Sequence, residues 1–441
     1  MSPPQLAPEP AREALSLVRV GSTMGGETGG GRPDPRDTVR TSLWTLGLLT
    51  CLQASGGERD VVQLKDGKEL HGRVVYEDTR FLILRKGSRD TQIDVNEIQH
   101  VESLSRNLDA LLDNTTRTQP WSVSDNELLA AQAQESGLEG EAALFWWRVL
   151  AIEPGNEAAH RALGHKKRGS GWGIPLDSRT VAQDKRVELA RDWGSAWEFH
   201  TLHYHLRTNL ALEIALDLAL DLERYYQGVF DLFAGELQLF DVCKPMNVCV
   251  YADRASYPET AAEAGHYDAA DDTVHVDASQ GFIWEVLAHE GAHQLLYDTA
   301  VRERSNSGAI PAWLDEGLAE YIAGCVGGYP WKLKLEPGRA LPRHFQTHAR
   351  APKPFTLGRV LNLSSGDFFA SSDRDLKYAQ AYTLVHFCLH ASDGRYRDGF
   401  LEFLRGIYHG QGSSTDFKHC LHAEERELEE AWLTYVKTKG R

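Results

Sequence analysis

Two histidines and a glutamate in the segment VLAHEGAHQLLYD (residues 286–298) have the types and the spacing of a metal site. Residues four apart on an α-helix lie on one face, so His289 and His293 can direct their imidazole rings at one point. Zinc accepts such nitrogen ligands and needs a third protein ligand, which leaves one position for water. Glu290 follows His289 directly and can reach that water without binding the metal. The five-residue pattern is short, so its interpretation depends on the sequence around it.

The flanking sequences FIWEVLA and QLLY are strongly apolar. A helix that is hydrophobic nearly all round is buried, and burying these polar groups without partners would be costly. A metal ion would remove that cost. We expect the third ligand in IPAWLDEGLAEYIAG (310–324), where Pro311 suits a helix start and Glu316 lies in the first turns. Glu320 lies one turn further on the same face, where it could accept a hydrogen bond from a zinc-bound histidine.

These two motifs, in this order, resemble the gluzincin zinc metallopeptidases, the thermolysin-like and aminopeptidase-N-like group. In that group a helix with His-Glu-x-x-His is followed by a helix that carries a glutamate ligand. The segment PAWLDEGLAEY is similar to the signature W-L-x-E-G-x-A, most closely as in the peptidase-MA-like bacterial members, and the resemblance extends over residues 197–437. It implies that His289, His293 and Glu316 bind one zinc ion per chain and that Glu290 is the general base.

Gluzincins often use a tyrosine or histidine to stabilise the oxyanion of the tetrahedral intermediate. The segment YAQAYTLVHF offers Tyr378 and Tyr382, four residues apart in an expected helix. We predict that Tyr378 has this role, because a residue at the helix start turns more easily toward the cleft. Packing of both tyrosines in the core is the alternative.

Two further pairs of histidines have a spacing that could suit a metal. His386 and His390 in HFCLH are four apart, but they lack an adjacent glutamate and a matching downstream acid. We therefore expect them to serve helix packing. His203 and His205 share one face of an expected strand, and we interpret them as structural.

The resemblance predicts a hydrolase that cleaves peptide bonds of a peptide or protein substrate. Aminopeptidases of the group carry Gly-x-Met-Glu-Asn before the zinc helix, and this chain does not; its KPMNVCV is a different sequence. An endopeptidase is therefore favoured, with GHYDAADDTVHVDA where a substrate-aligning strand would lie. Two alternatives stay open: a zinc-binding pseudoenzyme that docks partners through its N-terminal modules, and a zinc hydrolase of a non-peptide amide.

The overall charge excludes some partners. There are 47 Lys and Arg residues against 63 Asp and Glu residues, which gives a net charge of −16. Binding to nucleic acid or to an anionic membrane would require a basic face, so we expect neither. The six cysteines contain no C-x-x-C pair, which argues against a disulfide framework. Cys243 and Cys249 could bridge across a turn, but isolated thiols are favoured.

The first 55 residues differ in composition from the rest. Residues 1–39 are rich in Gly, Pro, Arg and Ser, and we expect a disordered leader. Residues 40–55 contain a short apolar run that ends in small residues, as in a signal peptide. This predicts export to the periplasm, cell envelope or exterior, with no membrane span in the mature chain. The protein would be cytoplasmic if the run were instead a buried helix.

The remaining chain divides into three predicted parts. Short alternating apolar runs separated by turns indicate a small SH3-like β-barrel at 59–105, either a docking module for a protein partner or, as favoured, a packing domain. Residues 122–165 indicate a helical hairpin that resembles one tetratricopeptide unit, a linker module. Residues 195–441 are the metallopeptidase domain. Strands followed by helices predict an α+β fold with a mixed sheet, a catalytic helix and a helical C-terminal part.

Overall fold

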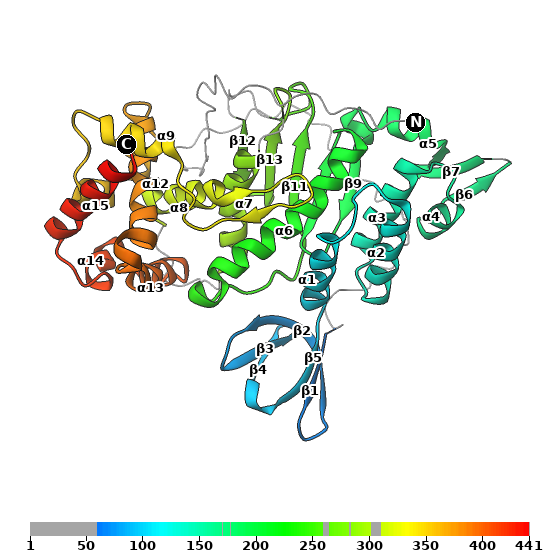
Figure 1. The fold of residues 1–441 in the computed structure, drawn as a ribbon, viewed down its shortest axis with the longest axis horizontal. Coiled ribbons are helices and arrows are strands. Elements are labelled where there is room, and N and C mark those ends of the chain that lie inside the picture. The colour runs from blue at the N-terminus through cyan, green and yellow to red at the C-terminus, as the bar shows by residue number, and fades with distance from the viewer. Residues whose placement is uncertain are drawn as a thin grey trace, which may run out of the picture.

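A computed structural model describes residues 60–440, apart from 170, 177, 259–263, 282–283 and 301–309. The chain is α+β, and Figure 1 shows an N-terminal sheet, a helical group, a central sheet with its helices, and a C-terminal group of helices. The expected leader at 1–39 and signal peptide at 40–55 lie outside the described residues. Among the residues described, none of the helices has the length and apolar composition needed to cross a bilayer.

The N-terminal sheet has five antiparallel strands in the order β4-β3-β2-β1-β5. Their bounds are β1 Asp60–Leu64, β2 Glu69–Glu77, β3 Phe81–Lys86, β4 Arg89–Asp94 and β5 Ile98–Glu102. Alternate residues face a small core around Val62, Leu82 and Leu84. This is the segment in which an SH3-like barrel was expected. Its edge strands β4 and β5 do not pair with each other, so the hydrogen-bonded sheet stays open.

A buried charge network fixes this sheet to the rest of the molecule. Arg73 Nη2 on β2 lies 2.9 Å from Asp241 Oδ2, and Asp241 also accepts hydrogen bonds from Ser105 and Tyr226. His203 Nε2 lies 3.0 Å from the second oxygen of Asp241, and its Nδ1 lies 2.6 Å from Glu223. His203 is therefore structural in this network, as the sequence suggested. Removing one member would leave a buried charge without its partner, which is costly.

The helical group follows the sheet directly. Its helices are α1 Leu104–Thr115, α2 Val123–Glu135, α3 Glu139–Ile152 and α4 Glu157–Ala162. Side chains of Ser103, Ser122 and Asn156 accept hydrogen bonds from the first turns of α1, α2 and α4, which explains where these helices begin. A three-stranded sheet (β6 Lys166–Arg168, β7 Gly171–Leu176, β8 Arg179–Val181) and α5 Gln183–Leu189 lead to the central sheet.

The central sheet is mixed, in the order β12-β13-β11-β10-β9. The strands are β9 Trp197–His200, β10 Tyr204–Thr208, β11 Met246–Tyr251, β12 Gly265–Asp268 and β13 Thr273–Asp277. The middle strands β10, β11 and β13 run parallel, while the edge strands β9 and β12 are antiparallel to their neighbours. One apolar face of the sheet packs on α6 Leu212–Leu237 and α7 Trp284–Thr299 (Figure 1).

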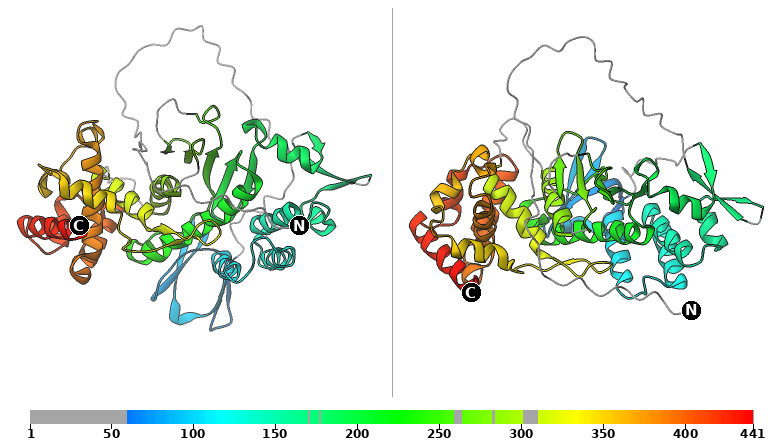
Figure 2. Two further views of the ribbon diagram at one scale, coloured as in Figure 1. Left: turned by 45° about the horizontal axis from the view of Figure 1, so that its top comes forward. Right: turned by 90° about the horizontal axis from the view of Figure 1, so that it is seen from above.

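The part after α7 is mostly helical. It contains α8 Ala312–Cys325, α9 Pro342–Arg350, α10 Leu357–Leu361, α11 Ser365–Phe369, α12 Arg374–His390, α13 Arg397–Tyr408, α14 Phe417–Cys420 and α15 Glu425–Lys439. A two-stranded ribbon, β14 Val326–Gly327 and β15 Lys334–Leu335, interrupts the helices. Figure 2 shows α8 between α7 and the C-terminal group.

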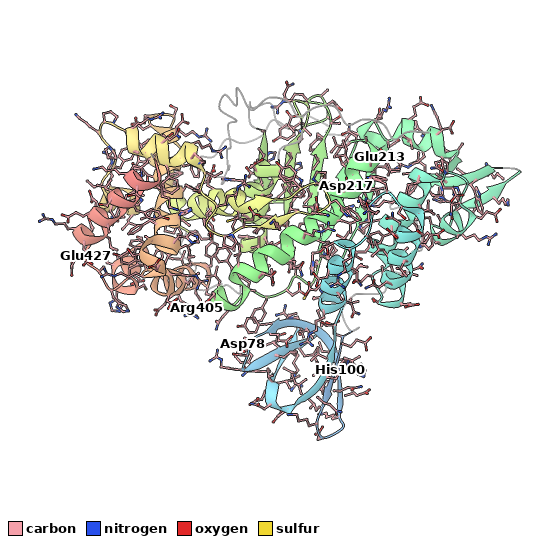
Figure 3. The ribbon with its side chains drawn as sticks, viewed as in Figure 1. Asp78, His100, Glu213, Asp217, Arg405 and Glu427 are labelled. Carbon is pink, nitrogen blue, oxygen red and sulfur yellow. The ribbon has the colours of Figure 1, made fainter. Side chains whose placement is uncertain are left out.

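The ribbon ties the helical group to the rest of the chain. Its loop places the Trp331 ring 3.9 Å from the guanidinium carbon of Arg148 on α3 and 5.3 Å from that of Arg224 on α6. Arg148 also pairs at 2.5 Å with Asp217, which Figure 3 labels on α6 beside the helical group. The five cysteines that the structure describes are all free, including Cys243 and Cys249.

Gly317 on α8 is required for close packing against α12. A Cβ at this position would lie 2.7 Å from the carbonyl oxygen of Ala381, so the two helices would have to separate. We predict that Gly317→Ala destabilises the protein by about 1–3 kcal/mol, the usual cost of overpacking, as measured by urea unfolding. The control is Gly235→Ala on α6, where a Cβ meets nothing within 4 Å and stability should stay the same or rise. Equal effects of the two substitutions would contradict this account.

Candidate metal centre

Helix α7 buries the three residues of the His-Glu-x-x-His pattern in the interior of the molecule. His289 is 2% exposed, Glu290 0% and His293 6%. The two histidines lie one turn apart, and their Nε2 atoms are 3.3 Å from each other. Both rings thus point to the same place, as the spacing predicted.

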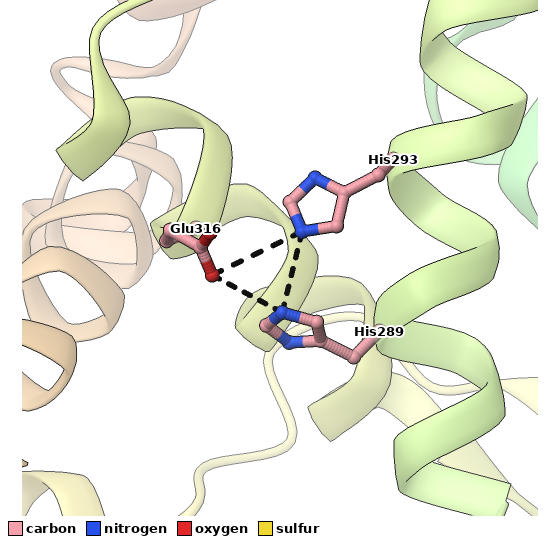
Figure 4. A group of neighbouring side chains, drawn as sticks. All are labelled: His289, His293 and Glu316. Atoms are coloured by element: carbon pink, nitrogen blue, oxygen red, sulfur yellow. Dashed lines mark hydrogen bonds and ion pairs between the residues drawn. The ribbon is translucent and has the colours of Figure 1, made fainter. Parts of the chain in front are cut away.

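Glu316 on α8 completes a three-residue group with the two histidines (Figure 4). Its Oε2 lies 3.2 Å from His289 Nε2 and 3.9 Å from His293 Nε2. Ligands at about 2.0–2.1 Å from a tetrahedral ion lie about 3.3 Å apart, so these separations fit one metal ion. In the part of the chain that the structure describes, this is the only group of three or more His, Cys, Asp or Glu residues close enough to share an ion.

The other nitrogen of His293 faces an acid that the sequence analysis did not single out. His293 Nδ1 lies 3.3 Å from Asp315 Oδ2, and the Tyr408 hydroxyl donates to the other oxygen of Asp315 at 3.0 Å. Burial alone would lower the pKa of His293, but Asp315 and Glu316 raise it to about 10. Asp315 therefore holds the ring so that Nε2 points at the metal position. The only sequence feature that pointed to Asp315 was its position next to Glu316 in WLDEG.

Glu320 lies near His289, but the predicted hydrogen bond between the two side chains is not formed. Its Oε1 is 3.7 Å from His289 Nδ1, beyond hydrogen-bond length. Its Oε2 instead accepts from His344 Nε2 at 2.9 Å and lies 3.2 Å from Arg343 Nη2. Burial raises the pKa of Glu320, but His344 and His289 shift it well below its usual range. Two residues of α9, His344 and Arg343, thus contact the Glu320 carboxylate. The sequence did not indicate these contacts, because α9 is distant from α8 along the chain.

Neither carboxylate oxygen of Glu290 has a side-chain hydrogen-bond partner among the described residues, and the backbone of Tyr267 on β12 is near enough to lower its pKa. Burial raises the pKa of Glu290 to about 7, although the two histidines act against this shift. The side chain lies beside the edge strand β12, where a Cβ on Gly265 would be 3.3 Å from Glu290 Cγ. A buried carboxyl with a pKa near neutrality can accept and return a proton.

The two tyrosines of α12 differ in their surroundings. The Tyr382 hydroxyl accepts from the Leu341 amide at 2.8 Å, which is a structural contact. The Tyr378 hydroxyl is buried, and the side chain of Arg374 lies near enough to lower its pKa. Burial raises the pKa of Tyr378 above its usual value, and the charges of Glu316 and Glu290 raise it further. Glu320, another carboxylate near the metal group, likewise raises the pKa of Tyr382, so these shifts do not separate the two tyrosines.

A family model described as "Protein of unknown function (DUF1570)" matches residues 284–407. The matched segment runs from the start of α7 into α13 and so contains the three candidate ligands, Glu290 and Tyr378. No curated protein matches the chain.

The other histidines have separate partners. His386 Nδ1 bonds the Tyr435 hydroxyl at 2.9 Å, and His390 Nε2 bonds the Tyr321 hydroxyl at 2.8 Å. The ring of His205 stacks on that of His200 at 4.1 Å. None of these histidines belongs to a candidate metal group in the described chain.

The geometry predicts about one divalent metal ion per chain, measurable by elemental analysis of the purified protein. Glu316→Ala removes one of three ligands and should lower the occupancy sharply. His386→Ala is the control, because this histidine lies outside the group and its loss should leave the occupancy unchanged. The reverse pattern would move the metal site to α12.

Proposed function

We propose that the protein is a zinc-dependent peptidase, most simply an endopeptidase. The observation that carries this proposal is the fully buried carboxyl of Glu290 beside a His289–His293–Glu316 group that fits one ion. Two imidazoles and one carboxylate suit zinc with an open position for water. The same donors also suit ferrous iron, but an adjacent buried base is what hydrolysis requires.

A zinc ion at this position would lower the pKa of a bound water and polarise a substrate carbonyl. Glu290 accepts the proton of the attacking water and then delivers it to the leaving amine. Tyr378 donates a hydrogen bond from its hydroxyl to the oxygen that becomes negative. Asp315 keeps His293 in the orientation that ligation needs. The buried surroundings strengthen each of these interactions.

The edge strand β12 supports a peptide substrate over another amide. In the described part of the chain β12 pairs with β13 alone, so its other edge has backbone groups that an extended peptide could pair with. Gly265 on this strand lies beside Glu290. A substrate on this edge would therefore lie next to the base. A small non-peptide amide would not need such an edge, and a scaffold would not need the base.

The first test separates metal binding from catalysis. In Glu290→Gln the base is removed but the ligands stay, so metal content and melting temperature should match wild type. Hydrolysis of a broad peptide library should fall by at least ~10²-fold. His289→Ala should lose both metal and activity. Wild-type rates in Glu290→Gln would refute the mechanism, and a fully metal-loaded wild type that cleaves nothing would favour the scaffold.

The second test compares the two tyrosines of α12. Tyr378→Phe should lower kcat by about 10²-fold, the scale for losing one oxyanion donor, with little change in stability. Tyr382→Phe leaves the buried Leu341 amide without its acceptor and should cost about 1–3 kcal/mol in urea unfolding, with kcat retained. A loss of kcat in Tyr382→Phe alone would reverse the assignment.

A further inference from the structure

The two histidines of the candidate metal centre differ at the ring nitrogen that faces away from the metal position. His293 Nδ1 lies 3.3 Å from Asp315 Oδ2. His289 Nδ1 is buried and has no hydrogen-bond partner among the described residues. A neutral imidazole that binds a metal through Nε2 carries its proton on Nδ1, and such an N–H is normally held by an acceptor. The metal centre therefore requires an acceptor beside His289.

The acid next to this nitrogen is Glu320 on α8. Its Oε1 lies 3.7 Å from His289 Nδ1, so a movement of about 0.5–1 Å would bring the pair to hydrogen-bond length. Glu320 is only 5% exposed, so the side chains around it, and not solvent, set the orientation of its carboxylate. The contacts of its second oxygen therefore decide whether Oε1 stays directed at His289.

His344 on α9 holds this second oxygen. Its Nε2 lies 2.9 Å from Glu320 Oε2, and its side chain is only 10% exposed. The His344 ring lies against the Tyr382 ring of α12, with the ring centres 4.7 Å apart. Figure 1 shows α9 beside α12. The Glu320 carboxylate thus lies between an imidazole of α7 and an imidazole of α9, and the second of these is itself packed in place.

Arg343 contacts the same oxygen more weakly. Its Nη2 lies 3.2 Å from Glu320 Oε2, but the arginine side chain is 58% exposed, and exposed ion pairs contribute little. Its Nε lies 3.3 Å from His344 Nε2. The contact between His344 and Glu320 is shorter, and an ionised carboxylate can only accept, so His344 Nε2 carries a proton and donates it to Glu320. His344 is therefore the buried residue that orients Glu320.

We propose that His344 is a positioning residue for the metal centre. It holds Glu320 so that Oε1 accepts a hydrogen bond from His289 Nδ1 when His289 binds the ion through Nε2. Helix α9, which provides none of the three candidate ligands, would in this way contribute to metal affinity. The inference rests on the zinc site of the proposed function and adds a residue from outside α7 and α8 to it.

The test measures the zinc affinity of each purified variant by competition with a chelating indicator, well below the melting temperature of that variant. His344→Phe keeps an aromatic ring against Tyr382 but removes the donor to Glu320. We expect it to weaken zinc binding by about 10-fold, the lower end of the range for partners of metal ligands. His344→Gln restores an N–H donor and should recover most of the affinity.

Two matched controls lie on the same helix. His348 follows His344 by four residues, is also buried, and bonds the Thr383 hydroxyl at 2.9 Å. His348→Phe should perturb α9 to a similar extent, which the melting temperature reports, but should leave zinc affinity unchanged. Arg343→Ala removes the exposed contact to the same oxygen and should weaken zinc binding by less than about 3-fold.

A double-mutant cycle decides whether His344 acts through Glu320. Glu320→Ala alone should weaken zinc binding by about 10–100-fold. Adding His344→Phe to this variant should have almost no further effect, because the carboxylate that His344 positions is gone. An undiminished effect of His344→Phe in the Glu320→Ala background would overturn the inference. So would an unchanged affinity in His344→Phe alone, or an equal loss in His348→Phe.

The readout also separates this inference from the peptidase proposal, because zinc affinity does not depend on hydrolysis. The expected pattern of affinities in a protein that cleaves no peptide would refute only the peptidase. Zinc-dependent hydrolysis by a protein whose zinc affinity does not respond to His344 would refute only the role of His344.

Discussion

The arrangement of this protein depends on one constraint, the burial of several ionisable groups where α7 meets α8. Two imidazoles and a carboxylate converge to within 3.9 Å of one another, and each residue is at most 6% exposed. Such groups are costly to bury unless they neutralise each other or share a cation. The neighbouring helices meet this demand: α13 supplies Tyr408 to Asp315, and α9 supplies His344 to Glu320. The helices after α8 thus complete the electrostatics of the centre.

Close packing of the helix backbones around α7 and α8 is also required. Gly317 allows α8 to approach Ala381 of α12, and Gly291 on α7 lies against the Tyr225 ring, where a Cβ would be 3.2 Å from the nearest ring carbon. The Tyr225 hydroxyl donates to the carbonyl of Ala288 at 2.7 Å, one residue before His289. Glycine at these positions lets α8 pack closely on α12 and α7 pack closely on α6. The two helices that carry the candidate ligands are thus each held against a neighbouring helix.

The N-terminal parts are held by charge networks of a similar kind. Asp241 joins Arg73 of the first sheet to His203 at the start of β10, and Trp331 packs against Arg148 and Arg224. Neither network touches the candidate metal centre. The first sheet and the helical group are nevertheless fixed relative to the central sheet. The helical hairpin at 122–165, which resembles a single tetratricopeptide unit, packs through α3 against α6 and β9. These contacts cover the face that a second unit would cover in a repeat protein, so one unit is stable here.

The sequence by itself determined which local elements form and which residues of α7 and α8 meet. The apolar flanks and the four-residue spacing placed His289 and His293 on one buried face, and Glu316 followed in the next helix, because period and burial are local properties of a helix. Only the tertiary structure decided the outer contacts. Asp315 contacts His293, Glu320 contacts His344, and the Tyr382 hydroxyl accepts a hydrogen bond from the Leu341 amide. These choices depend on the angle and distance at which α9, α12 and α13 cross α8, and side chains far apart in the chain set that geometry.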